Sequence, residues 1–152
     1  LMEKLQSALE TYRLKFRAYP SPTNPLLYDI PTQTASYTQA DLEKNNEDLH
    51  YFLTTQFKKG ANVARGEVEA AVDGGPFVTG GLNERETLTK GTKTYIVDAW
   101  HNPVVFKLER RSYPDPIDAT IIIKMDVPVL YSFGINGLDN GGAGDDVIAG
   151  KQ

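Results

Sequence analysis

The chain has 152 residues, of which 40% are hydrophobic and 24% charged, a composition typical of one soluble globular domain with a modest core. The net charge of -4 at pH 7 gives no electrostatic reason to expect nucleic acid or an anionic membrane surface as a partner. The absence of cysteine excludes disulfides, thiol catalysis and Cys-ligated metal sites, and no run of about 18 apolar residues is present to span a bilayer.

Apolar residues at three- and four-residue spacing predict an amphipathic helix over residues 1–19, ended by Pro20 and Pro22. The apolar positions are Leu1, Leu5, Ala8, Leu9, Tyr12, Phe16 and Tyr19. No capping residue precedes Leu1, so we expect this helix to continue upstream in the intact protein. The chain is therefore interpreted as a fragment whose natural N-terminus has been removed.

A second amphipathic helix is predicted after a proline-rich extended loop over residues 21–33. It begins within the capping sequence T-Q-A-D at 38–41 and ends near Gly60. Its apolar face is formed by Leu42, Leu49, Phe52, Leu53 and Phe57. Residues 62–91 have a weaker pattern with Gly-Gly pairs, which indicates loop with short strands.

Four short β-branched or aromatic runs follow, and each is bounded by turn residues. They cover residues 93–97, 104–108, 120–125 and 129–133. The turn signal Asn102-Pro103 predicts that the first two form a hairpin. Since helices come first and strands last, we expect one α+β domain with an antiparallel sheet. Its parts are a helix (1–19), a helix with loops (20–91), and strands with a terminal loop (92–152).

The C-terminal segment, residues 131–150, contains six of the 13 glycines and three aspartates but no lysine or arginine. Like charges on a flexible backbone repel one another, and ordering glycine removes much conformational entropy. A hard cation bound by carboxylate, amide and backbone oxygens would offset both effects, and Ca2+ is the usual candidate. The alternative is a mobile, solvated chain end.

Within this segment, residues 141–149 read G-G-A-G-D-D-V-I-A and match the calcium nonapeptide pattern G-G-x-G-x-D-x-U-x. Such repeats bind calcium between successive turns of a β-roll, yet only one copy occurs in this chain. The pattern leaves open a second hypothesis, an extracellular calcium-dependent binding module. The EF-hand pattern fails because no glutamate stands at its twelfth position.

Three other motifs together resemble the major pseudopilins of type II secretion systems. Residues 98–106, D-A-W-H-N-P-V-V-F, resemble the family signature D-x-W-G-N-P-x-x-Y, with His101 in place of the usual glycine. Residues 131–137, Y-S-F-G-I-N-G, followed by D-D-V-I at 145–148, resemble the family calcium loop S-x-G-x-D-G … D-I. The pair Tyr19-Pro20 resembles the end of the family helix, whereas residues 21–95 match nothing in it.

The resemblance implies a pilin-like fold, in which the N-terminal helix packs on a small antiparallel sheet and a C-terminal loop binds Ca2+. By position, the implied ligands are loop carbonyls and the side chains of Asn136, Asp145 and Asp146, with Ser132 at the start of the loop. Asn136 replaces the family aspartate and offers an oxygen without a charge, which Asp139 could supply instead.

The function implied is that of a structural subunit of a secretion pseudopilus or a related filament, without catalytic activity. Its partners would be other copies of itself and minor pseudopilins. An N-terminal apolar helix, missing from this sequence, would anchor it in the inner membrane, and residues 1–152 would lie in the periplasm.

Other side chains are interpreted as structural. We expect Trp100, the only tryptophan, to be a buried anchor, and His50 and His101 to lie on the surface. Ser132 lacks the G-x-S-x-G context of a nucleophile and is expected to shape the loop. A hydrolase that uses paired carboxylates has no support in the sequence.

Overall fold

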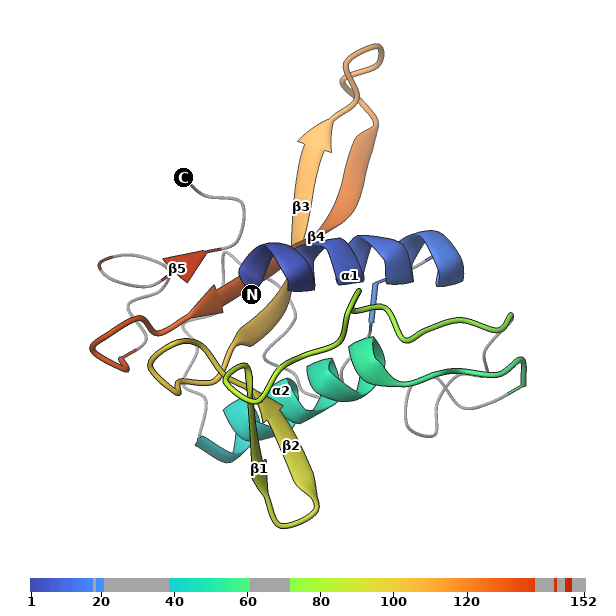
Figure 1. The fold of residues 1–152 in the computed structure, drawn as a ribbon. Helices are drawn as coiled ribbons and strands as arrows, with labels where there is room; N and C mark the ends of the chain where they lie inside the picture. The colour runs from blue at the N-terminus through green and yellow to red at the C-terminus, as the bar shows by residue number, and fades with distance from the viewer. Residues whose placement is uncertain (18, 21–38, 61–71, 139–143, 145–146, 149–152) are drawn as a thin grey trace.

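The computed structural model describes residues 1–17, 19–20, 39–60, 72–138, 144 and 147–148 (Figure 1). Within these ranges two helices precede five strands, which form two antiparallel sheets. The elements are α1 (Met2–Phe16), α2 (Gln39–Thr54), β1 (Thr87–Lys90), β2 (Lys93–Ile96), β3 (Val105–Pro114), β4 (Ile122–Ser132) and β5 (Val147–Ile148). The predicted α+β class, with an N-terminal helix and small antiparallel sheets, is confirmed.

Both helices end earlier than their apolar pattern predicts. α1 stops at Phe16 because Arg17 adopts a left-handed conformation, with φ of 62°, and its N–H donates to the Arg13 carbonyl. α2 stops at Thr54 because Phe57 leaves the helix to exchange two backbone hydrogen bonds with Gly74. None of the helices in the described ranges is long and apolar enough to cross a membrane.

The sheets differ from the predicted strand pairing. β2 pairs with β1, which lies within the range 62–91 where short strands were expected, and not with β3. The predicted hairpin of two paired strands across Asn102-Pro103 is therefore wrong. The segments on either side of that turn meet at an isolated bridge between Val97 and Pro103 and at two backbone hydrogen bonds, from Asp98 to Asn102 and from Val104 to Ile96. The third and fourth predicted strands are one continuous strand, β4, with Pro128 inside it opposite Leu108. Pro128 is tolerated because β5 pairs with β4 only at Tyr131 and Ser132, which leaves the rest of that edge open in the described residues.

The β3–β4 hairpin extends beyond the rest of the fold (Figure 1). Figure 1 shows its far half projecting past α1, away from both helices. Its near half enters the hydrophobic core, whose largest members come from the helices, the loop after α2 and the inner ends of the strands. The fully buried side chains include Leu5, Leu9, Leu49, Phe52, Leu53, Phe57, Ile96, Val104, Phe106 and Tyr131.

Two adjacent asparagines of α2 join the two sheets. The Asn45 side chain donates to the Phe106 carbonyl at 2.9 Å and accepts from the Phe106 N–H at 3.0 Å. The Asn46 side chain donates to the carbonyls of Ile96 and Val104 and accepts from the Ile96 N–H. Both side chains are completely buried, so these bonds help to satisfy backbone groups in the interior of the protein.

We predict that Asn46→Ala lowers the free energy of unfolding by about 2–4 kcal/mol, because it leaves the Ile96 N–H and the Val104 carbonyl buried without their partner. Urea unfolding measures the change. Glu43→Ala on the same helix is the matched control, because Glu43 forms a long, surface ion pair with Lys90 at 3.9 Å, and the expected loss is below about 0.5 kcal/mol. Equal losses in the two variants would contradict a special role for the buried amide.

A polar cluster fastens the segment after α1 back to the helix. The Tyr19 hydroxyl donates to Glu10, and Arg13 forms an ion pair with the same carboxylate at 3.0 Å. The hydrogen bond from Tyr19, aided by Arg13, holds the pKa of Glu10 below its ordinary value despite some burial. Burial, followed by the bond to Glu10, raises the pKa of Tyr19 to about 12.

These shifts predict the pH dependence of stability. The lowered Glu10 pKa contributes stability above pH 4.5 that is lost as the pH falls further, and the raised Tyr19 pKa contributes stability that is lost as the pH rises beyond 10. We expect Tyr19→Phe to flatten both limbs of the melting temperature against pH. Tyr113→Phe, an exposed tyrosine on the projecting hairpin, serves as the control and should leave the curve unchanged. Identical curves for wild type and Tyr19→Phe would contradict the assignment.

Candidate metal-binding loop

The segment Asp98–Asn102 forms a tight turn held by one carboxylate. Asp98 Oδ1 accepts hydrogen bonds from the backbone N–H groups of Trp100 at 2.8 Å and Asn102 at 2.9 Å. The backbone N–H of Asp98 donates to the Asn102 carbonyl, and its carbonyl accepts from His101 N–H. Asp98 is 7% exposed, and its other oxygen, Oδ2, is buried without a hydrogen-bond partner. The aspartate of the D-A-W-H-N-P motif therefore shapes the backbone of the turn.

The turn places its central residues at the surface. Trp100 is 45% exposed, so its predicted role as a buried anchor is wrong. The reason is that the backbones of Asp98 and Asn102 pair across the base of the turn, which leaves residues 99–101 at its tip. His101 is exposed, as expected, and its φ of 63° lies in the left-handed region that favours glycine. His50 is half-buried in α2.

Asn102 joins this turn to the start of the C-terminal loop. Its Nδ2 donates to the Gly134 carbonyl at 2.6 Å, across 32 residues of sequence. Gly137 approaches the same side chain, since a Cβ on Gly137 would lie 3.2 Å from Asn102 Oδ1, and its φ is +68°. Glycine at position 137 thus permits both the backbone conformation and the contact. The sequence pattern predicts a turn at Asn102 and gives no sign of its contact with Gly134 and Gly137.

The loop starts and returns at neighbouring strands. β4 ends at Ser132, and β5 pairs antiparallel with it, so that Ser132 lies opposite Val147 and Tyr131 opposite Ile148. Ser132 is 1% exposed, so it forms part of the base of the loop and is covered from solvent. The sheet therefore fixes both ends of a loop that spans residues 133–146.

Among the predicted ligands, Asn136 is exposed, and its Oδ1 accepts a hydrogen bond from the Leu138 N–H at 2.7 Å. A carbonyl oxygen has two lone pairs, so this bond is compatible with a cation ligand role. Ser132, which also belongs to the predicted set, is the buried residue at the base of the loop, and the three predicted acidic ligands, Asp139, Asp145 and Asp146, lie outside the described residues. In the ranges that the structure describes, no three His, Asp or Glu side chains are grouped to hold a metal ion.

Comparison with protein-family models, with curated proteins and with solved structures finds no match for this chain.

The positive φ of His101 predicts how substitutions in this turn change stability. We expect His101→Val to lower the free energy of unfolding by about 1–2 kcal/mol, because a β-branched residue tolerates a positive φ poorly. His101→Gly should be neutral or stabilising, because relief of the strain offsets the flexibility that glycine adds to the unfolded chain. The matched control is Ala99→Gly in the same exposed turn, at a residue without a positive φ, where we expect a loss of about 0.4–1 kcal/mol. Equal losses from glycine at 99 and at 101 would contradict strain at His101.

Proposed function

We propose that this chain is the globular part of a pseudopilin-like filament subunit whose C-terminal loop is ordered by Ca2+. The proposal combines the α+β architecture, with its N-terminal helix and antiparallel sheets, and the resemblance of three motifs to major pseudopilins. In this role the protein performs no catalysis and acts through assembly with other copies of itself and with minor subunits.

The observation that carries the proposal is the hydrogen bond from Asn102 to Gly134. It joins the D-A-W-H-N-P turn to the Y-S-F-G-I-N-G loop, the two segments that most resemble the family. Nothing in their sequence separation requires these segments to meet. Their contact supports the proposal that the two segments form one site, in which the turn holds the first part of the loop in place.

Oxygen donors in and beside the loop fit a hard cation. Asn136 Oδ1, the carboxylates of Asp139, Asp145 and Asp146, and loop carbonyls would hold the ion, and no nitrogen or sulfur ligand is needed. The cation would neutralise a segment that carries three negative charges and no positive one. Because Asn102 and the β4–β5 pairing already fix both ends of the loop, less conformational entropy remains to be lost when the ion binds.

The alternative function, a β-roll binding module, is disfavoured by the direction of β5. The nonapeptide repeats belong to parallel β-helical stacks, in which each repeat lies on the next. Here Val147 and Ile148, which come from the nonapeptide, pair antiparallel with β4 of a different segment. The single copy is therefore better explained as part of a loop that returns to an antiparallel sheet.

The proposed location is the periplasm, with an N-terminal helix anchored in the inner membrane before assembly. Sequencing the gene upstream of codon 1 tests this part of the proposal. A stretch of about 20 apolar residues that is preceded by Gly-Phe-x-x-x-Glu supports a filament subunit, because that length spans a bilayer. Further G-G-x-G-x-D repeats downstream would support the binding module instead.

Calcium is predicted to stabilise the folded chain. At a hundredfold excess over Kd the gain is about 2.7 kcal/mol, which corresponds to about 5–10 °C in melting temperature for a chain of this size. The melting temperature measured in calcium and in EDTA checks this, and the double variant Asp145→Ala/Asp146→Ala should lose the difference.

Asp118→Asn is the control for this experiment, because it removes a carboxylate from the exposed, far end of the β3–β4 hairpin. It should keep the full response to calcium. If EDTA leaves the melting temperature of the wild-type chain unchanged, the calcium proposal fails.

A further inference from the structure

At the tip of the β3–β4 hairpin an exposed apolar side chain, Ile117, lies between two acidic residues, Asp115 and Asp118. Ile117 is 97% exposed, the highest value among the exposed large apolar side chains of the described residues. Asp115 Oδ1 accepts from the N–H groups of Ile117 and Asp118, and Asp118 Oδ1 accepts from the N–H and hydroxyl of Thr120. These bonds order the tip, so Ile117 is held in water on a defined turn.

The apolar surface continues down the hairpin, over the segment 112–125, which we call the hairpin arm. Its exposed apolar side chains are Tyr113, Ile117, Ile121, Ile122 and Met125. A two-stranded hairpin has no layer of its own to cover such side chains and is only marginally stable in isolation. By the alternation of a strand, Tyr113 and Met125 share one face of the hairpin and Ile122 lies on the other. Exposed apolar side chains concentrated in this way are typical of an interaction site.

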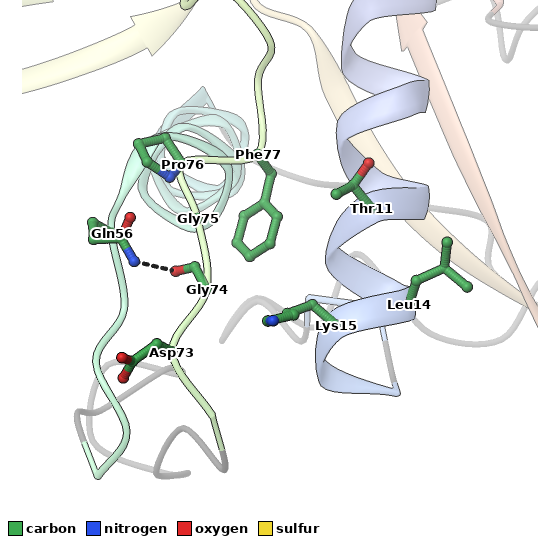
Figure 2. A pocket seen from close by; sticks show the side chains of 9 residues that line it. All are labelled: Thr11, Leu14, Lys15, Gln56, Asp73, Gly74, Gly75, Pro76 and Phe77. Carbon is green, nitrogen blue, oxygen red and sulfur yellow. Dashed lines mark hydrogen bonds between the residues drawn. The ribbon is translucent and has the colours of Figure 1, made fainter.

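An open groove lies in a different part of the molecule from the hairpin tip. It lies between the last turns of α1 and the segment 73–77, has a volume of about 520 Å3, and is lined by Thr11, Leu14, Lys15, Gln56, Asp73, Gly74, Gly75, Pro76 and Phe77 (Figure 2). Leu14 is 71% exposed at its edge, and the ring of Phe77 lies between the helix and the loop.

Among the described residues in and next to this groove, basic ones outnumber acidic ones. Lys15 lines it, and three exposed basic residues follow in the adjoining segments, Arg17 directly after α1 and Lys58 and Lys59 after α2. The lining also holds an acid, Asp73, whose Oδ1 accepts a hydrogen bond from the Lys59 backbone N–H. The groove therefore offers the exposed Leu14 side chain to Ile117 and the Lys15 ammonium to Asp115 and Asp118.

We propose that the hairpin arm of one copy docks in the α1 groove of a second copy, with Ile117 against Leu14 and the tip acids beside Lys15. The tip, at the far end of the β3–β4 hairpin (Figure 1), and the groove, lined by α1 and the segment 73–77, involve different residues of one chain. The contact is therefore heterologous, and a pair of copies keeps one free tip and one free groove. Such a contact propagates into a ring or an open filament. This inference rests on the proposed function and specifies which surfaces join successive subunits.

A single tip-to-groove contact is small, and interfaces below about 1,200 Å2 are weak and transient. Disulfide trapping suits such a contact, and every thiol is an introduced one because the chain has no cysteine. We expect a mixture of Leu14→Cys and Ile117→Cys chains, oxidised at high concentration, to form about tenfold more mixed dimer than either homodimer, since docking raises the effective concentration of the two thiols. Thr92→Cys, at the exposed tip of the β1–β2 hairpin, replaces Ile117→Cys in the matched control and should show no such excess.

Charge reversal provides the second measurement. Lys15→Glu in the Leu14→Cys chain, or Asp118→Lys in the Ile117→Cys chain, should each reduce the mixed dimer several-fold, and the two reversals together should restore it. Homodimers as abundant as the mixed dimer, or no rescue by the double reversal, would overturn the docking proposal. The two tests of the proposed function, the calcium-dependent melting temperature and the upstream coding sequence, do not involve the arm. Their results can therefore support a filament subunit even when no mixed dimer is trapped, and in that case the subunits join by other surfaces.

Discussion

The buried amides of Asn45 and Asn46 are the interaction on which the rest of the fold depends. The two small sheets share no strand, and their backbones meet at the isolated Val97–Pro103 bridge and at the hydrogen bond from the Val104 N–H to the Ile96 carbonyl. Two side chains of α2 strengthen this junction by pairing with the backbone of Ile96, Val104 and Phe106. A buried amide without partners would destabilise the protein, but here the donors and acceptors of the side chains and strands satisfy each other.

The position of these bonds explains why the turn at 98–102 is well defined. Ile96 and Val104 stand on either side of the turn, so the Asn46 side chain holds the two chain segments that enter and leave it. Asp98 then closes the turn from within, and Asn102 extends from it to Gly134. The order of a loop near the C-terminus is thus linked, through successive side-chain hydrogen bonds, to a helix about ninety residues earlier in the sequence.

Features that depend on local periodicity could be predicted from the sequence, and features that depend on distant partners could not. The apolar spacing located both helices, and β-branched runs located β2 and the inner half of β3. The sequence N-N-E-D at 45–48 has the composition of a solvent-facing stretch, yet Asn45, Asn46 and Asp48 are buried because α2 packs against strands of both sheets.

The candidate site can also be predicted only in part, because one of its contacts joins distant residues. The sequence identifies the motifs at 98–106 and 131–137. It does not reveal the hydrogen bond between Asn102 and Gly134, because a turn-forming asparagine gives no local sign of a partner 32 residues away. For Trp100 the residue type itself is misleading. The large apolar side chain predicts burial, whereas the hydrogen bonds between Asp98 and Asn102 at the base of the turn leave Trp100 at its exposed tip.

The amides of Asn45 and Asn46 also determine how the native state opens. An amide proton exchanges with solvent when its hydrogen bond breaks, and the N–H groups of Ile96 and Phe106 are bonded to side chains of α2. Their exchange therefore requires α2 to separate from the strands, which couples both sheets and the helix into one cooperative unit. In the described part of the chain, the hydrogen bonds of the hairpin arm at 112–125 join residues of the β3–β4 hairpin to one another, so it can open while that unit remains closed.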